Sequence, residues 1–286
     1  MQIVLQGIVF LLMVSVGMSL RPMEVASTVR RVEPWYWLGL LAATFLVPPA
    51  LALLIANVFR LTPGETLGLF MVGVAPGAPL LTRNLARRGF EMHMAATYQV
   101  WAALLIPVML PLVVAAGASL YGKIVWISPL ELLKQIAEKQ FLPLSVGVGI
   151  AWAAPKISQR LQPRLTILGN LLFTGLVVAV LIKLGPALRA VTPLTPVAAA
   201  LLAVGSVVAI LLLPFRNVNI KETFAICNAN RHVGLALLLT GEYGRGQSAL
   251  PAILCYALVA PVLLLIWAKR HHAMEAPLAR SVDQGA

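Results

Sequence analysis

Apolar stretches long enough to cross a lipid bilayer recur along the whole chain, and this feature restricts its fold more than any other. A transmembrane helix needs roughly 20 apolar residues, and stretches of about 18 to 25 such residues occur in both halves of the sequence. Hydrophobic residues make up 60% of the 286 residues, and charged residues make up 11%. We therefore predict an all-α polytopic membrane protein, because a helix satisfies its own backbone hydrogen bonds where no water is available.

We expect nine membrane spans, of which the third and the eighth are interrupted. The first apolar stretch is as hydrophobic as a secretory signal, but it lacks a preceding basic flank and a small-residue cleavage site, so we assign it as a span. Lys and Arg are more numerous in the connections on the side of the C-terminus, which predicts an outside N-terminus and a cytoplasmic C-terminus in the inner (plasma) membrane of the cell. The expected spans are residues 2–20, 34–59, 65–87, 92–116, 139–154, 166–183, 194–213, 221–243 and 248–268.

A polar segment joins the two halves of the chain between the fourth and fifth spans. Ser128 and Glu131 have the spacing of a capping box, and Leu130 and Leu133 lie on one helical face. We expect an interfacial amphipathic helix here, with that capping box at its start and that apolar face in the membrane surface.

The first interrupted span contains two prolines and an arginine. Pro76 and Pro79 each remove an amide donor, so the helix is predicted to end just before Pro76 and to restart near Pro79. The amides at the start of the second helix would then favour an anion at membrane depth. A proline kink packed against neighbouring helices explains the prolines equally well. Thr82 and Arg83 in the next turn favour a polar cavity.

The second interrupted span has no proline but contains four strongly polar side chains, those of Asn228, Asn230, Arg231 and His232. An arginine at the centre of a membrane helix costs about 2.5 to 3.5 kcal/mol on insertion scales, so it is expected to have a function. Asn tolerates left-handed backbone, which favours an unwound turn. Polar contact between helices is the alternative, but an arginine and a histidine beside two asparagines exceed what such packing requires.

The two interrupted spans hold equivalent places in the two halves. Each precedes the last span of its half, and the halves have opposite orientations in the membrane. This pattern predicts an inverted repeat with two discontinuous helices that cross at its centre, where secondary transporters bind their substrates. The candidate substrate-binding residues are Pro79, Leu80, Thr82, Arg83, Asn228, Asn230, Arg231 and His232.

Three segments of the chain resemble the bile acid:sodium symporter family. GMSLRPMEV (residues 17–25) resembles the segment that follows the second helix of that family. VGVAPGAPLLTRNLARRG (residues 72–89) and NANRHVGLALLLT (residues 228–240) resemble its two crossover segments. The resemblance extends over nearly the whole chain, with nine of the ten family helices.

The resemblance implies a panel domain and a core domain that contains both discontinuous helices. One domain would move against the other, so that the substrate site faces each side of the membrane in turn. Residues 271–286 are polar and contain a proline, so we expect them to be disordered. The implied division is residues 1–31 and 129–190 for the panel domain (three spans plus the interfacial helix), 32–128 and 191–270 for the two halves of the core domain, and 271–286 for the cytoplasmic tail.

The positions that match the sodium ligands of the family carry other residues here. They are Thr44, Leu81, Thr82, Gln99, Cys227 and Arg231. The family's glutamate corresponds to Cys227, and its glutamine corresponds to Arg231. A hard cation needs several oxygen ligands, and a guanidinium repels it. We therefore predict that Arg231 replaces the bound cation as a fixed positive charge. In the family the acidic end of the substrate meets the two helix starts, which correspond to Pro79 and His232.

These patterns predict a secondary transporter of a small organic anion that works by an elevator-like motion and without sodium coupling. The alternatives are a sodium- or proton-coupled symporter, with His232 as the proton carrier, and a membrane receptor or sensor of the same fold. A single thiol at Cys227 gives little support to an arsenite-type carrier. No Ser/Lys or paired Asp pattern predicts an enzyme, and no cofactor or metal site is expected. The net charge of +12 follows from the positive-inside rule rather than from nucleic-acid binding, and the sequence indicates no oligomeric state.

Overall fold

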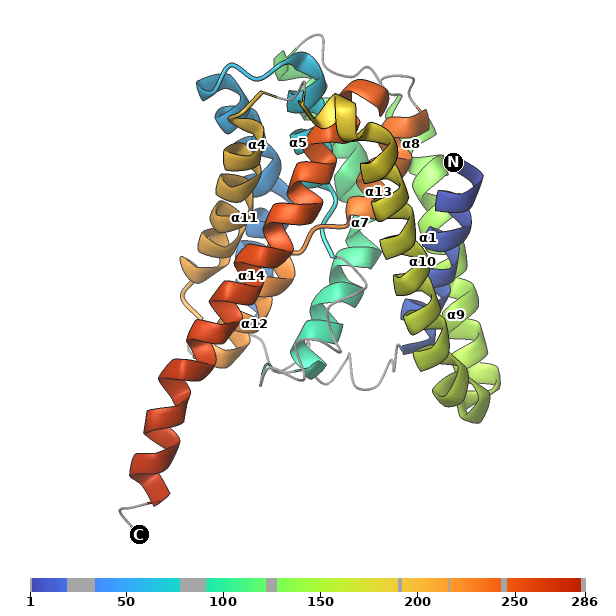
Figure 1. Cartoon of the computed structure of the whole chain (residues 1–286). Coiled ribbons are helices and arrows are strands. Elements are labelled where there is room, and N and C mark those ends of the chain that lie inside the picture. The colour runs from blue at the N-terminus through green and yellow to red at the C-terminus, as the bar shows by residue number, and fades with distance from the viewer. Residues whose placement is uncertain are drawn as a thin grey trace.

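The described part of the protein is a bundle of helices without strands (Figure 1). The computed structural model describes residues 2–19, 34–77, 90, 92–121, 128–189, 192–215, 217–242 and 246–283. The helices are α1 (Gln2–Ser19), α3 (Pro34–Leu41), the π-helix η1 (Ala42–Leu46), α4 (Val47–Val58), α5 (Pro63–Val74), α7 (Met92–Tyr121), α8 (Pro129–Ile136), the π-helix η2 (Ala137–Phe141), α9 (Leu142–Ala153), α10 (Pro155–Arg189), α11 (Thr195–Leu211), α12 (Val218–Ala229), α13 (Val233–Glu242) and α14 (Gly246–Asp283).

Several of these helices have the length and hydrophobicity of membrane spans. Four are long and apolar enough to cross a bilayer, and two shorter helices are also apolar. The protein is therefore an all-α integral membrane protein. The four long segments are Trp35–Val58, Met94–Ser119, Pro155–Ala179 and Ser248–Ala268, and the shorter ones are Ile3–Ser19 and Thr195–Leu211.

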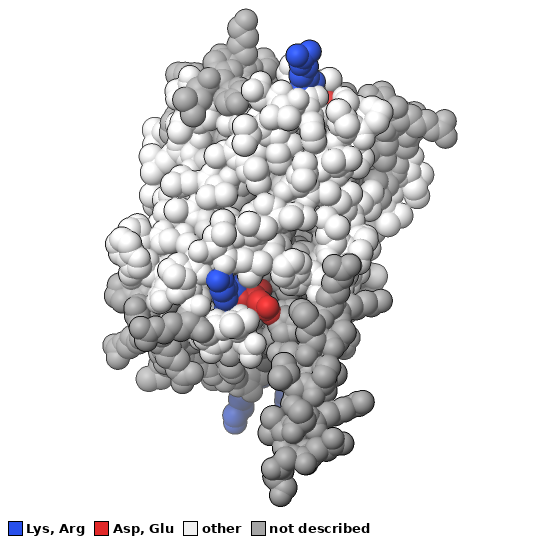
Figure 2. All heavy atoms as spheres, turned by 90° about the vertical axis from the view of Figure 1, so that its left-hand side faces the viewer, with Lys and Arg blue, Asp and Glu red and all other residues white. Residues whose placement is uncertain are grey.

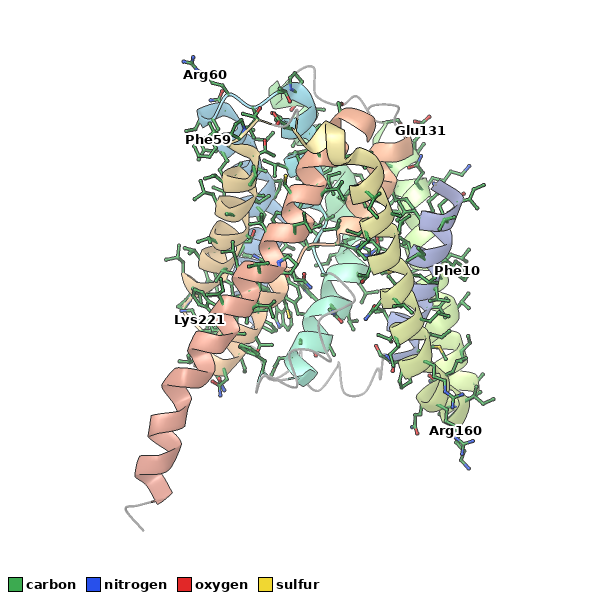
Figure 3. The ribbon with its side chains drawn as sticks, in the orientation of Figure 1. Phe10, Phe59, Arg60, Glu131, Arg160 and Lys221 are labelled. Carbon is green, nitrogen blue, oxygen red and sulfur yellow. The ribbon has the colours of Figure 1, made fainter. Side chains whose placement is uncertain are left out.

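The charged side chains labelled in Figure 3 lie toward the two ends of the bundle. Arg60 and Glu131 are at one end, and Arg160 and Lys221 lie toward the other (Figure 3). On the face shown in Figure 2, a broad surface between the described charged residues carries no Lys, Arg, Asp or Glu. This distribution is the one expected when a hydrocarbon layer surrounds the middle of the bundle.

The helices form two packed groups. We call α1, α9 and α10 the three-helix group, in which α1 packs against both of the others (Figure 1). Gly17 of α1 and Gly147 of α9 bring two backbones together, since a Cβ atom built on Gly17 would lie 2.1 Å from the Leu144 carbonyl oxygen. The larger group joins α5 to α4 and α14, and α11 to α4, α12 and α14. The two groups meet where α1 contacts α13 and α10 contacts α14.

The segment that joins the two halves is helical, as expected, but it continues into the next span and lacks the predicted capping box. It is helical from Pro129 through η2 to the end of α9, and the π-turn η2 lies just before Pro143, which has no N–H to donate within the helix. Ser128 makes no side-chain capping hydrogen bond, so the predicted capping box is wrong. The buried residues of α8 are Leu132 and Ile136, whereas Leu130 and Leu133 are exposed.

Two other boundaries also differ from those predicted. α10 begins at Pro155, before the expected start of the sixth span at 166, since a proline fits the first turn of a helix. α14 continues to Asp283, so residues 271–283 are helical rather than disordered and project from the bundle (Figure 1). This segment contains three alanines, the residue that favours helix most.

Candidate functional site

Two non-helical stretches touch each other inside the larger group. Residues 230–232 separate α12 from α13, and residues 75–77 follow the end of α5. Ala75 leaves helical geometry before Pro76, with φ −107° and ψ 80°, as a residue that precedes proline commonly does. The His232 N–H donates a hydrogen bond of 2.8 Å to the Ala75 carbonyl oxygen.

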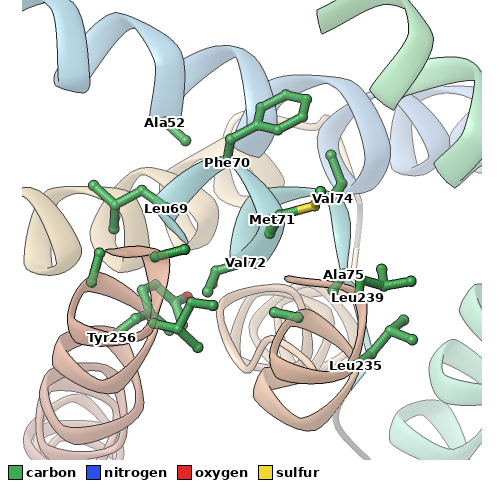
Figure 4. Packing of buried hydrophobic residues seen from close by; sticks show 14 of the residues in the cluster. Ala52, Leu69, Phe70, Met71, Val72, Val74, Ala75, Leu235, Leu239 and Tyr256 are labelled. Carbon is green, nitrogen blue, oxygen red and sulfur yellow. The ribbon is translucent and has the colours of Figure 1, made fainter. Parts of the chain in front are cut away.

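The helices around this contact are tightly packed. Figure 4 shows Val72 of α5 and Ala75, which follows α5, together with Leu235 and Leu239 of α13 and Tyr256 of α14. All five belong to one buried hydrophobic cluster. The contact between the two non-helical stretches is therefore held on the α5 side by apolar packing.

Two carbonyl groups in the helical run α3–η1–α4 lack their usual backbone donors. η1 is a π-turn, in which an N–H donates five residues back rather than four. Pro48 and Pro49 follow it and have no N–H. The Thr44 carbonyl therefore has no helical donor, because the positions four and five residues ahead of it are both prolines. The Ala43 carbonyl also loses its π-helical donor, which would be Pro48.

Asn228, in the last turn of α12, uses one of these free carbonyls. Its Nδ2 donates to the carbonyl oxygens of Ala43 at 3.0 Å and of Ser206 at 2.8 Å. Its Oδ1 accepts from the Tyr98 hydroxyl at 3.0 Å. The side chain is fully buried and both donors and the acceptor are used, so Asn228 fastens α12 to α7, α11 and η1.

Arg231 uses the other free carbonyl. Its Nη1 and Nη2 donate to the Thr44 carbonyl oxygen at 3.0 and 3.1 Å, and the residue is only 1% exposed. Its Nε has no acceptor among the described residues. A buried guanidinium that binds one neutral carbonyl retains most of its charge uncompensated.

Two tyrosines complete the surroundings of this group. The Tyr98 hydroxyl lies 3.2 Å from Thr44 Oγ1, in addition to its bond with Asn228. The Tyr256 hydroxyl donates to the Ala229 carbonyl oxygen at 2.5 Å and so satisfies the end of α12. Both rings are buried, as are the side chains of Asn228 and Arg231.

His232 caps the start of α13. Its Nδ1 accepts a 3.0 Å hydrogen bond from the N–H of Leu235, which places the ring hydrogen on Nε2 in this geometry. Nε2 is buried and has no partner among the described residues. The Leu235 amide, one of those expected to meet an anionic substrate at this helix start, thus already donates to the imidazole.

A cavity of about 330 Å³ opens beside these residues, between the three-helix group and the larger group. α1 and α10 form one wall, and residues 230–232, α13 and α14 form the other. Its lining is apolar apart from residues 230–232, Thr174 and Tyr256. The arrangement fits a small molecule with a polar acceptor group at one end and an apolar body.

The structure brings together some of the residues predicted from sequence. Thr44 and Arg231 are in contact, and Cys227 is buried in the same cluster as Ala43 and Tyr98. Asn230, Arg231 and His232 line the cavity. The predicted residues Pro79, Leu80, Leu81, Thr82 and Arg83 lie outside the described residues.

Sequence reasoning missed three groups. Gln99, a predicted former cation-site position, is buried in α7, and its neighbour Tyr98 makes contacts with Thr44 and Asn228 that the sequence did not indicate. A tyrosine in an apolar helix is a signal for such a buried polar contact. Tyr256 and the carbonyl of Ala43 were also missed, and the consecutive prolines after η1 were the available signal for the latter. Within the described part of the chain, no group of three His, Cys, Asp or Glu side chains is placed to hold a metal ion.

The sequence matches the profile of the sodium bile acid symporter family over residues 7–190, which is more than half of the chain. The chain belongs to this family. This match confirms the resemblance found in the sequence. Members of the family are membrane transporters and not enzymes. The comparison with curated proteins gave no match. The matched region of this symporter-family chain ends before α11, so Cys227 and Arg231 lie beyond it.

Proposed function

We propose that this chain is a secondary carrier for a small organic anion and that it works without obligatory sodium coupling. The observation that supports this most directly is the bond of Arg231 with the carbonyl of Thr44. Both residues occupy positions that correspond to cation ligands in the resemblance described above. The guanidinium provides the positive charge that a sodium ion would otherwise supply.

The position of Arg231 opposes sodium binding in two ways. The Thr44 carbonyl oxygen already accepts two hydrogen bonds from Arg231, which leaves little capacity for an ion. A cation about 4 Å from the guanidinium would be repelled by about 4 kcal/mol at an effective dielectric constant near 20. Cys227 adds no carboxylate to offset this repulsion.

The division into two helix groups supports alternating access. In this proposal the three-helix group, with α8, is the panel domain, and the larger group is the core domain. The core has two discontinuous helices that cross at residues 75–77 and 230–232, in an inverted repeat of nine spans. The N-terminus lies outside and the C-terminus in the cytoplasm, in the inner (plasma) membrane.

The substrate lies in the cavity between the two groups. Asn230, Arg231 and His232 form its polar end, and the apolar walls from α1 and α10 contact the body of the molecule. Asn228 acts indirectly, because all its polar atoms are already bonded. Pro79, Leu80, Thr82 and Arg83 would approach from the first crossing helix.

Transport assays in proteoliposomes test this proposal. A thermal-shift screen of organic anions, with and without sodium, first selects a bound anion, since a ligand stabilises the folded protein by mass action. Radiolabelled taurocholate is the starting probe, because the family is named for bile acids. We expect the same initial rate of uptake in sodium and in potassium media. Strict sodium dependence refutes the sodium-independent mechanism, and binding without flux indicates a receptor.

A further inference from the structure

The charge of Arg231 has no counter-charge in the described structure. The buried charged side chains there are those of Arg231 and Glu65. Glu65 lies in the first turn of α5 and accepts hydrogen bonds from threonines, not from Arg231. The cavity lining includes no carboxylate. Among the described residues, the region between α12 and α13 therefore carries one positive charge that no carboxylate compensates.

This charge is attached to the larger helix group. Arg231 follows α12 and is bonded to Thr44 of η1, which packs against α4 and α11. Asn228 fixes the same region to α7 and α11. A sodium ion can leave the carrier before the empty carrier returns across the membrane. The guanidinium of Arg231 is part of the chain and cannot leave. When the larger group moves across the membrane, the charge moves with it whether or not substrate is bound.

We propose that this fixed charge places the voltage dependence of transport on the empty carrier, while net transport of a monovalent anion runs in the direction that the electrochemical gradient favours. This inference rests on the proposed function. Counted over the described residues, which do not include Arg83, a carrier loaded with a monovalent anion has no net charge at the site, because the anion and Arg231 cancel. The empty carrier then has a charge of +1 there, so its return across the membrane moves charge.

The membrane potential then acts on one half of the transport cycle. A potential of 100 mV, negative inside, changes the ratio of inward- to outward-facing empty carriers by about 50-fold for one charge that crosses the whole field. The potential draws the empty site toward the cytoplasm, where it binds the anion. The neutral loaded carrier then moves outward unaffected by the potential. One cycle exports one negative charge, in agreement with the direction that the potential favours.

Exchange of one anion for another follows a different rule. Both crossings of an exchange cycle are made by the loaded, neutral carrier. Exchange is therefore independent of voltage, whereas net flux is not. If Arg231 is replaced by a neutral residue, the empty carrier becomes neutral and the loaded carrier acquires a charge of −1. The voltage dependence then moves to the loaded steps, so exchange becomes voltage-dependent.

Charge movement without any substrate is the first test. The purified full chain is placed in planar bilayers, and the transient current after voltage steps is integrated. We expect wild type and Arg231→Lys to move up to about one charge per protein, and Arg231→Gln to move much less. Equal charge movement in wild type and in folded Arg231→Gln overturns the inference, as does the absence of charge movement from the wild type.

Radiolabelled taurocholate flux in proteoliposomes is the second test, with the potential set by potassium and valinomycin. We expect wild-type exchange to be unchanged between 0 and −100 mV, while net efflux rises and net uptake falls. Exchange that slows with voltage in wild type overturns the inference even where Arg231→Gln fails to fold. Flux that depends strictly on sodium contradicts the proposed function instead, and the substrate-free charge movement still decides the present inference.

Discussion

The two buried charged side chains in the described part of the protein, Glu65 and Arg231, are held in opposite ways. The Glu65 carboxylate accepts five hydrogen bonds of 2.8 to 3.0 Å from the backbones or hydroxyls of Thr62, Thr192 and Thr195. Arg231 donates only to the Thr44 carbonyl, and its Nε has no acceptor in the described structure. Both side chains are less than 5% exposed.

This difference separates a charge that stabilises the fold from a charge with capacity left for a ligand. The hydrogen bonds of Glu65 join the start of α5 to the residues before and within α11, and they replace most of its lost hydration. Arg231 has exchanged its hydration for a single acceptor, so an anion in the adjacent cavity gains from its field. We therefore expect substitution of Glu65 to lower mainly the stability of the protein. Substitution of Arg231 should lower mainly its affinity for an anion.

The largest effect on stability is expected for Glu65→Gln. The amide has nearly the same shape, but its NH₂ group faces hydroxyl and backbone donors, so several buried donors lose their acceptor. We expect a loss of about 3 to 5 kcal/mol, at about 1 to 3 kcal/mol per unsatisfied group. Thermal unfolding of the detergent-solubilised protein measures it, as a fall in Tm on the order of 10 °C.

The matched control for Glu65 is Glu131→Gln, which makes the same chemical change at an exposed carboxylate of α8. That variant is expected to unfold within about 0.5 kcal/mol of wild type. If both variants unfold at the same temperature, the hydrogen bonds of Glu65 do not stabilise the fold, and the contrast with Arg231 is lost.

A smaller loss of stability is expected for Tyr98→Phe, which tests the hydrogen bonds in the region of Arg231. The variant keeps the ring contacts with Phe224 and Trp101 but leaves Asn228 Oδ1 buried without its donor. This is expected to destabilise the protein by about 1 to 2 kcal/mol. Tyr36→Phe is the control, because Tyr36 is partly exposed and stacks its ring on Phe215. Equal Tm values for the two variants would show that the Tyr98 hydroxyl does not hold Asn228.

The fold was predictable from sequence where hydrophobicity alone determines the structure. Long apolar stretches fix the helices, since backbone groups in lipid have no other partners. Local motifs were less informative. Thr62 and Glu65 have the same spacing as Ser128 and Glu131, but only the first pair forms a capping box. Glu65 is also held by Thr192 and Thr195, and such long-range support is invisible in a four-residue motif.

The polar side chains of the candidate site were predictable from sequence, but their hydrogen-bond partners were not. Asn228 and Arg231 stood out because polar side chains in an apolar segment need partners. The partners did not stand out, because two of them are backbone carbonyls whose availability depends on the π-turn at η1. Thr44 was indicated only by family resemblance, as the equivalent of a side-chain ligand, whereas the structure uses its carbonyl oxygen for Arg231.

The smallest change in stability is expected at Arg231, although the functional change there is large. Arg231→Met fills similar space and leaves the Thr44 carbonyl without its donor, which costs about 1 to 3 kcal/mol. The variant also removes a guanidinium whose burial is poorly compensated, and this gain is of similar size. We expect a Tm within about 3 °C of wild type or above it, together with at least about a tenfold loss of anion affinity, which corresponds to about 1.4 kcal/mol. Thermal unfolding with and without the anion measures both quantities, and Arg160→Met at an exposed position is the control. A fall in Tm as large as that of Glu65→Gln, with anion affinity preserved, would make Arg231 a structural charge like Glu65 and would remove the basis for its role in anion binding.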